Sequence, residues 1–139
     1  MKKGLFPGSF DPFTKGHEAI VLKAIHLFDK IYIGIGINSN KKYLFETENR
    51  IKHIKEIFKN YSNVQVGTYQ KLTVDYCKEI KASHIIRGLR NSSDFEYEKT
   101  IAHMNNAISG IETIFFLSDE KHSALNSSII REMYTNKAD

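Results

Sequence analysis

The first segment whose side chains are suited to chemistry contains two glycines and lies near the N-terminus. Its sequence is Pro7-Gly8-Ser9-Phe10-Asp11-Pro12-Phe13-Thr14-Lys15-Gly16-His17. Gly8 and Gly16 allow the backbone to approach a ligand closely. His17 would stand at the start of the following helix, where free N–H groups and the helix dipole favour an anion. A tight turn with a helix-capping histidine is the simpler interpretation of a lone Gly-His pair. From these residues alone both an anion site and a capped turn remain open.

A second group of candidate residues is Arg87-Gly88-Leu89-Arg90, directly after a short apolar run. Two guanidiniums on a loop that contains a glycine can each hold phosphate oxygens in a bidentate way. Two arginines after a strand are also commonly just solvated. The pattern is therefore compatible with phosphate binding without requiring it.

Other residue patterns give little support to different chemistries. Gly34-Ile35-Gly36 lacks the third glycine of a dinucleotide fingerprint and lies inside an expected strand, which favours close packing instead. The histidines show no metal-ligand spacing, and a single cysteine cannot build a thiolate metal site. Cys77 is interpreted as a half-buried helix residue rather than a nucleophile.

Apolar runs and helical spacings alternate along the chain, and this alternation positions the candidate residues. Strands are expected at 5–6, 31–37, 63–69, 84–86 and 113–117. Helices are expected over 16–28, from a Thr47 cap to residue 58, over 74–80, over 94–108, and after a cap at Ser127 or Ser128.

Regular alternation of strands and helices predicts a doubly wound α/β fold: a Rossmann-like parallel sheet with helices on both faces. We expect a single domain over residues 1–139. In such folds ligands bind beyond the carboxyl ends of the strands. The candidate ligand-binding segments are therefore those after the strands: 7–17, 38–42, 72–73, 87–90 and 118–128.

Composition and charge set broad limits on function. The 139 residues are 41% hydrophobic and 26% charged, with a formal net charge of +4. The positive residues are scattered rather than clustered, so no nucleic-acid partner is expected. No run approaches the roughly 20 apolar residues that span a membrane, and the start does not resemble a signal peptide. One cysteine excludes an intrachain disulfide, and we expect a cytoplasmic location.

Two of these motifs, together with residues downstream of the second one, resemble a known family. Thr14-Lys15-Gly16-His17 matches the T/H-x-G-H signature of the nucleotidylyltransferase superfamily. The Arg-Gly-Leu-Arg segment, then Asp-Phe-Glu-Tyr-Glu at 94–98 and His-Met-Asn at 103–105, is similar to phosphopantetheine adenylyltransferases in particular. The resemblance runs from about Lys3 to Glu132. It implies reversible adenylyl transfer from ATP to 4′-phosphopantetheine, giving 3′-dephospho-coenzyme A and pyrophosphate.

The resemblance also implies roles for individual residues. Catalytic roles fall on His17, Lys41 and Arg90. ATP binding falls on Ser9, Phe10, His17, Gly88, Leu89, Arg90, Glu98, His122, Ser123, Ala124, Leu125, Asn126, Ser127 and Ser128. Phosphopantetheine binding falls on Ser9, Lys41, Thr73, Arg87 and Asn105. Asn126 interrupts the family's usual serine and threonine run, and His122 replaces what is often a bulky aromatic.

The chemistry implied is a direct displacement without a covalent enzyme intermediate. The acceptor phosphate is already an anion near neutral pH, so catalysis should come from positioning and charge stabilisation. Mg²⁺ should arrive with ATP rather than occupy a protein metal site, and the family resemblance implies a homohexamer. Two alternatives remain: another adenylyl- or cytidylyltransferase with a different phosphate acceptor, or a non-catalytic nucleotide-binding regulator.

Overall fold

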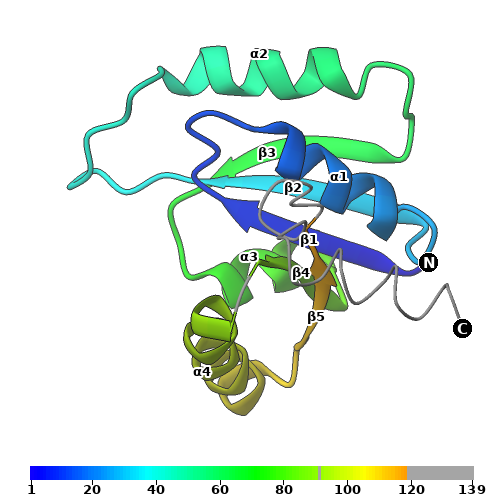
Figure 1. Cartoon of the computed structure of the whole chain (residues 1–139), viewed down its shortest axis with the longest axis vertical. Coiled ribbons are helices and arrows are strands. Elements are labelled where there is room, and N and C mark those ends of the chain that lie inside the picture. Colours follow the sequence, from blue (N-terminus) through cyan, green and yellow to red (C-terminus); the bar gives the residue numbers. More distant parts are fainter. Residues whose placement is uncertain (91, 119–139) are drawn as a thin grey trace, which may run out of the picture.

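Within the described residues, five strands hydrogen-bond side by side, all in parallel, in the order β3-β2-β1-β4-β5. The computed structural model describes residues 1–90 and 92–118 (Figure 1). The strands are β1 (Lys3–Gly8), β2 (Lys30–Gly36), β3 (Val64–Tyr69), β4 (His84–Leu89) and β5 (Glu112–Leu117). The helices are α1 (Lys15–Ala24), α2 (Thr47–Ile57), α3 (Thr73–Ile80) and α4 (Ser92–Ser109).

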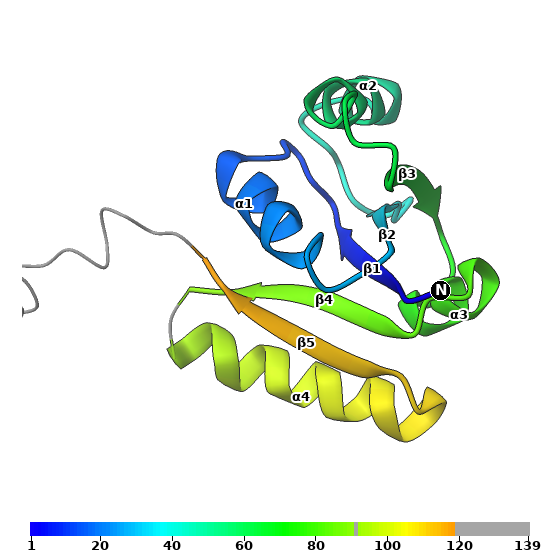
Figure 2. The same cartoon turned by 90° about the vertical axis from the view of Figure 1, so that its right-hand side faces the viewer.

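Successive strand residues point to opposite faces of the sheet and so build two apolar layers. Phe6 and Ile86 belong to the buried cluster beneath α1 and α2. Their neighbours Leu5 and Ile85 belong to a second cluster that packs on α3. Figure 2 shows α1 and α2 on one side of the sheet and α4 on the other. The predicted doubly wound α/β architecture, with helices on both faces, is confirmed.

The structure corrects several local expectations. Strand β4 continues through Leu89, so Arg87 and Gly88 lie on the strand, paired in register with Phe115 and Phe116, rather than on a loop. Thr47 is the first residue of α2 and makes no cap; Glu46 holds the N-cap position without a side-chain hydrogen bond. Cys77 is fully buried, and burial raises the pKa of its thiol to about 11.

The expected close packing at the glycines of β2 is confirmed for Gly34. A Cβ at this position would lie 2.8 Å from Leu5 Cδ1 and 3.1 Å from Tyr76 Cε2. Both distances are shorter than ordinary carbon–carbon contacts, so only glycine lets these side chains meet the strand.

The order of the strands creates a crevice between β1 and β4. From β1 the chain passes to α1 on one face, and from β4 it passes to α4 on the other face (Figure 2). At such a switch point the connections diverge and leave room for a ligand. In the described part of the chain no helix is long and apolar enough to cross a membrane.

Candidate functional site

A cavity of about 580 Å³ opens where the ends of β1 and β4 diverge, and we call it the central cavity. Seven of the residues expected to hold ligands line it: Ser9, Phe10, His17, Arg87, Gly88, Arg90 and Glu98. They come from the loop after β1, the first turn of α1, the end of β4 and the first half of α4. The two motifs, about 70 residues apart in sequence, therefore meet in one site.

His17 is held in place by the same turn that starts α1. Thr14 is the N-cap, and its hydroxyl accepts a hydrogen bond from the His17 backbone N–H at 3.3 Å. In return, the Thr14 N–H donates to His17 Nδ1 at 2.9 Å, which completes a reciprocal capping box. The ring also meets Phe10 edge-on, with centroids 5.0 Å apart. The capped-turn interpretation of the Gly-His pair is therefore confirmed, and the same residue also lines the central cavity, where anion binding stays a prediction.

The contact at Nδ1 determines which nitrogen of His17 carries the proton. A nitrogen that accepts from a backbone N–H has no hydrogen of its own, so the neutral ring is protonated at Nε2. Burial lowers the pKa of His17 below its usual 6.5, and the positive charges of Arg87 and Arg90 lower it further. His17 therefore offers an uncharged N–H donor at neutral pH.

Phe10 borders the central cavity, as its predicted ligand contact requires, but its ring is largely packed inside the protein. Its side chain is buried, and it packs edge-on against Phe6 with ring centroids 5.2 Å apart. Its backbone has a positive φ of 48°, which is uncommon for a bulky residue. A contact with a ligand in the central cavity would therefore fall to the backbone of this residue more than to its ring.

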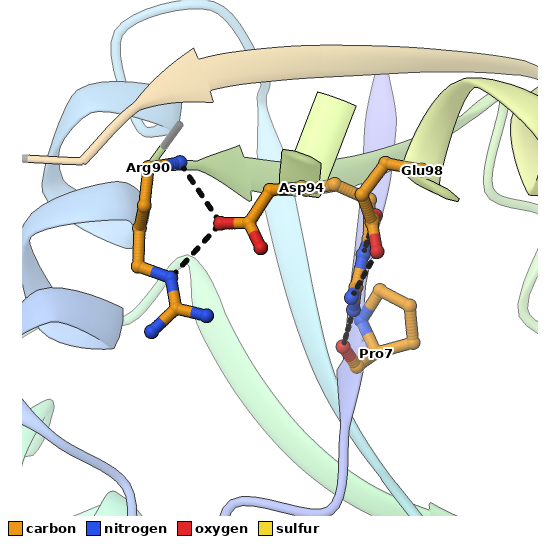
Figure 3. A network of polar contacts seen from close by, with 5 residues as sticks. Pro7, Arg90, Asp94 and Glu98 are labelled. Carbon is orange, nitrogen blue, oxygen red and sulfur yellow. Dashed lines mark hydrogen bonds and ion pairs between the residues drawn. The ribbon is translucent and has the colours of Figure 1, made fainter. Parts of the chain in front are cut away.

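Arg87 is oriented by a carboxylate on the neighbouring helix. Its Nε and Nη2 donate to the two oxygens of Glu98 at 2.6 and 3.0 Å, and its Nη1 donates to the Pro7 carbonyl at 2.7 Å. Figure 3 shows Glu98 and Pro7 grouped on one side of the network. A guanidinium has five N–H bonds, so two have no hydrogen-bond partner within residues 1–90 and 92–118 and are available to a ligand. Glu98, expected to contact ATP, thus also acts as the partner of Arg87.

Arg90 stands at the other side of this network, joined to Asp94 (Figure 3). Its Nε lies 3.0 Å from Asp94 Oδ2, and its backbone N–H donates to the same oxygen at 3.3 Å. These hydrogen bonds hold the pKa of Asp94 below its ordinary value. Sequence reasoning misses Asp94 in this role, because Arg90 lies before α4 and the helical spacing rule does not apply to the pair.

Two smaller cavities adjoin the central cavity and contain three more of the predicted residues, Lys41, Thr73 and Asn105. The Lys41 cavity, about 550 Å³, shares Gly8 and Ser9 with the central cavity. The Asn105 cavity, about 220 Å³, contains Thr73 and shares Arg87 with the central cavity. Gly8 borders all three. Lys41 therefore lies beside the central cavity, across Ser9, and not in its wall.

The wall of the Asn105 cavity contains polar groups beyond the predicted residues Thr73, Arg87, Glu98 and Asn105. The Tyr69 hydroxyl lies 3.0 Å from Thr73 Oγ1, and the Tyr69 ring stacks on Tyr76 with centroids 4.6 Å apart. Thr113 also lines this cavity, and its buried hydroxyl makes no hydrogen bond within the described residues. A chain of amides could exchange hydrogen bonds with these groups along its length.

Some predicted site residues are not placed in these compartments. Leu89 is the last residue of β4 and does not line any of the three cavities. The segment His122–Ser128 lies outside the described residues. Within residues 1–90 and 92–118, no three His, Cys, Asp or Glu side chains gather in a way that could hold a metal ion.

Two further residues connect the loops around the site, and no local sequence pattern indicates either role. Arg50 on α2 is buried and donates to the Ser9 carbonyl at 2.7 Å. The Asp11 carboxylate accepts from the backbone N–H groups of Leu44 and Phe45 at 2.5 and 2.7 Å. The loop after β1 is thereby tied to the loop after β2.

Comparison with known proteins points to one family. The cytidylyltransferase-like family matches residues 5–133. A phosphopantetheine adenylyltransferase of Flavobacterium psychrophilum is 51% identical over 139 residues, which is all of this chain and 92% of that protein. The corresponding Flavobacterium johnsoniae protein is 52% identical over 133 residues, 96% of this chain and 88% of that protein.

Solved structures agree on the fold. A putative nicotinate-nucleotide adenylyltransferase from Vibrio parahaemolyticus superposes with a TM-score of 0.61 at 22% identity, covering 100% of this chain and 90% of that chain. At this identity the likeness concerns the fold alone. Family membership follows from the match over residues 5–133 and from about 50% identity to relatives over nearly their full length. The chain belongs to the cytidylyltransferase-like family and, within it, to the phosphopantetheine adenylyltransferases.

Proposed function

We propose that this protein transfers the adenylyl group of ATP to 4′-phosphopantetheine, giving 3′-dephospho-coenzyme A and pyrophosphate in the biosynthesis of coenzyme A. The observation that carries the proposal is the meeting of three donors in one cavity: His17 from α1, Arg87 from β4 and Arg90 after it. A site built of two guanidiniums and an imidazole N–H suits several phosphate groups at once. Its neighbour, the Asn105 cavity, has the polar and apolar walls that a pantetheine arm would require.

The reaction is an in-line displacement at the α-phosphorus. An oxygen of the acceptor phosphate forms a new bond to this phosphorus while the bond to the β-phosphate oxygen breaks, and pyrophosphate leaves with that electron pair. The acceptor is already an anion, so no general base is needed. The difficulty is charge, because two polyanions must approach each other. Preorganised donors reduce that repulsion in the transition state.

The residues divide this work by position. His17 donates its Nε2–H to a phosphate oxygen as charge develops, and Arg90 neutralises the ATP phosphates beside it. Arg87 holds the acceptor phosphate with its two remaining N–H bonds. Lys41 reaches across Ser9 from its own cavity to the reacting phosphates. Mg²⁺ enters as part of the Mg-ATP substrate.

A turnover assay tests the proposal directly. Purified protein with Mg-ATP and 4′-phosphopantetheine is expected to release pyrophosphate and to form dephospho-coenzyme A, detected by mass spectrometry. Unphosphorylated pantetheine and nicotinamide mononucleotide serve as matched acceptors. Neither should react, since the first lacks the anion that Arg87 holds and the second lacks the arm that fits the Asn105 cavity.

The assay also separates the alternatives. Reaction with nicotinamide mononucleotide but not with phosphopantetheine would make the protein an adenylyltransferase with another acceptor. ATP binding by calorimetry without any pyrophosphate release would make it a nucleotide-binding regulator. Either result would overturn the proposed function.

We extend the proposal to assembly and location. A homohexamer is supported by exposed apolar side chains on one side of α4, where Tyr97, Met104 and Ile108 are 67%, 56% and 58% exposed. Apolar side chains grouped in this way favour burial against another protein surface. We place the reaction in the cytoplasm, where ATP is available and a lone thiol such as Cys77 stays reduced.

A further inference from the structure

Arg50 is buried to an extent that is unusual for an arginine. It lies on α2, and only 3% of its surface is exposed. Its guanidinium serves three oxygen atoms: the Ser9 carbonyl at 2.7 Å, the Phe45 carbonyl at 3.1 Å and the Thr47 hydroxyl at 3.2 Å. Fully buried arginines are rare unless their donors are satisfied in this way.

The same guanidinium stacks on a tyrosine that closes the loop after β2. Arg50 Cζ lies 4.3 Å from the centre of the Tyr43 ring. The Tyr43 hydroxyl accepts from the Asn38 backbone N–H at 2.8 Å and donates to the Gly36 carbonyl at 3.4 Å. These contacts close the segment from Gly36 to Tyr43, which contains Lys41, into a loop. The Tyr43 ring at the end of this loop packs on Arg50.

Asp11 supplies a second tie between the same two loops. Its carboxylate accepts from the backbone N–H groups of Leu44 and Phe45. Arg50, Asp11 and Tyr43 together form what we call the loop clamp. The clamp joins the backbone of Ser9, on the border between the central cavity and the Lys41 cavity, to the loop that holds Lys41.

We infer that Arg50 is a positioning residue that holds Lys41 at the distance from Ser9 at which its ammonium group can reach the reacting phosphates. The inference rests on the proposed function, since it assigns Lys41 to the adenylyl-transfer step. Arginine suits the task because its planar fork donates in several directions at once and stacks on an aromatic ring. Lysine at this position would keep the charge but lacks the planar fork that donates to the Ser9 and Phe45 carbonyls while it stacks on Tyr43.

A double-mutant cycle between Arg50 and Lys41 tests the coupling. Arg50→Lys is expected to lower kcat about 10- to 100-fold, the effect of a misplaced catalytic group, with a much smaller change in KM for ATP. In a Lys41→Ala background, already slowed, the same change should lower kcat less than about threefold, because Lys41 is no longer there to misplace. Thr47→Val is the matched control, since it removes the one Arg50 contact that stays within α2, and it should leave kcat unchanged.

A second variant and a structural readout keep the test independent of how well Arg50→Lys folds. Tyr43→Phe leaves Arg50 in place but removes the hydroxyl that holds Asn38 and Gly36. Its effect on kcat should also become smaller in the Lys41→Ala background. Backbone amide exchange at Leu44 and Phe45 should accelerate in Arg50→Lys and not in Thr47→Val, whether or not the protein turns over substrate.

The possible outcomes distinguish a failure of the inference about Arg50 from a failure of the proposed function. If the losses for Arg50→Lys and Lys41→Ala multiply in the double variant, Arg50 does not act through Lys41 and the inference is wrong. Unchanged amide exchange at Leu44 and Phe45 would also overturn it. If the unmodified protein binds ATP but shows no turnover, the proposed function fails instead, and the exchange data still report on the clamp.

Discussion

The two nitrogens of His17 perform separate tasks. Nδ1 accepts from the Thr14 N–H and so helps to start α1, while Nε2 carries the proton that a phosphate oxygen can accept. The lowered pKa of the ring keeps it neutral, so that it donates without adding a positive charge to the two arginines beside it. A mutation here therefore has one effect on the helix and another on the chemistry.

Two substitutions separate these effects. His17→Ala should lower kcat by about two to three orders of magnitude, the usual result of losing a preorganised donor, and should also reduce the free energy of unfolding by roughly 1 kcal/mol, because the Thr14 N–H loses its acceptor in the capping box. His17→Gln should lower kcat similarly but keep its stability, because a glutamine at this position completes a capping box. Steady-state kinetics and urea unfolding of both variants provide the measurements.

The pH dependence of the free energy of unfolding tests separately whether the pKa of His17 is lowered in the folded protein. Because the pKa of His17 is lower in the folded protein than the usual 6.5, the unfolded chain takes up its proton first as the pH falls. The free energy of unfolding of the wild type therefore decreases below about pH 6.5, and His17→Gln lacks that component. Full activity in His17→Ala would contradict the mechanism.

At the scale of elements, the ion pair between Arg87 and Glu98 joins β4 to α4. Glu98 is buried and its carboxylate faces the guanidinium with both oxygens. The pair is therefore both a packing contact between a strand and a helix and a restraint on the orientation of the Arg87 guanidinium, which borders the central cavity and the Asn105 cavity.

Glu98→Gln should reveal both functions. The amide cannot accept from two N–H bonds with a full negative charge, so we expect a loss of about 1–3 kcal/mol in the free energy of unfolding. Affinity for phosphopantetheine should fall with it, because Arg87 loses its fixed orientation. Glu96→Gln, an exposed position on the same helix, is the matched control for urea unfolding and calorimetry. Equal acceptor affinities in the two variants would show that Glu98 does not orient Arg87.

Local pattern is sufficient to predict the elements but not the connections between their ends. The β-branched run at 31–37 and the helical spacing at 16–28 are properties of neighbouring residues, and both elements form, although α1 ends early at Ala24. The Arg87-Gly88 pair has the pattern of a strand break and predicts that β4 stops at Ile86. Pairing with β5, a property of the distant chain, carries the strand to Leu89 instead.

Two features of the site depend on distant parts of the chain and leave no local signal. Arg50 stands among charged residues in Glu48-Asn49-Arg50-Ile51-Lys52, where the pattern is typical of a solvated helix face. Its burial results from two loops that close over it. Likewise the family resemblance assigns Arg87 and Glu98 to different ligands, and only the packing of α4 on β4 brings them together.

At the scale of the whole molecule, the apolar side of α4 bears on assembly. Tyr97, Met104 and Ile108 follow one another at intervals of seven and four residues, which places them along one stripe of the helix. Exposed apolar stripes of this kind are typical of surfaces that become buried between subunits.

The proposed hexamer predicts a specific response to charge on this stripe. The wild type should sediment at about six times the 16.0 kDa mass of one chain. Met104→Lys combined with Ile108→Lys should produce smaller species, because two buried ammonium groups would oppose association. Lys99→Glu, a charge change elsewhere on the same helix, should sediment like the wild type. A monomeric wild type would contradict the proposed hexamer.

The central place of β1 has a consequence for the order in which the chain folds. Gly4 pairs with Ile31 on one side and with His84 on the other. Strand β1 is synthesised first, but both of its edges are paired only after β4 has been synthesised. A growing chain can form β1, β2 and β3 with their helices much earlier, as a half-sheet with one open edge. That half-sheet already carries His17 but has neither arginine of the cavity. We therefore expect nucleotide to bind the half-sheet more weakly than the completed protein, so that its binding free energy stabilises the complete fold over this intermediate.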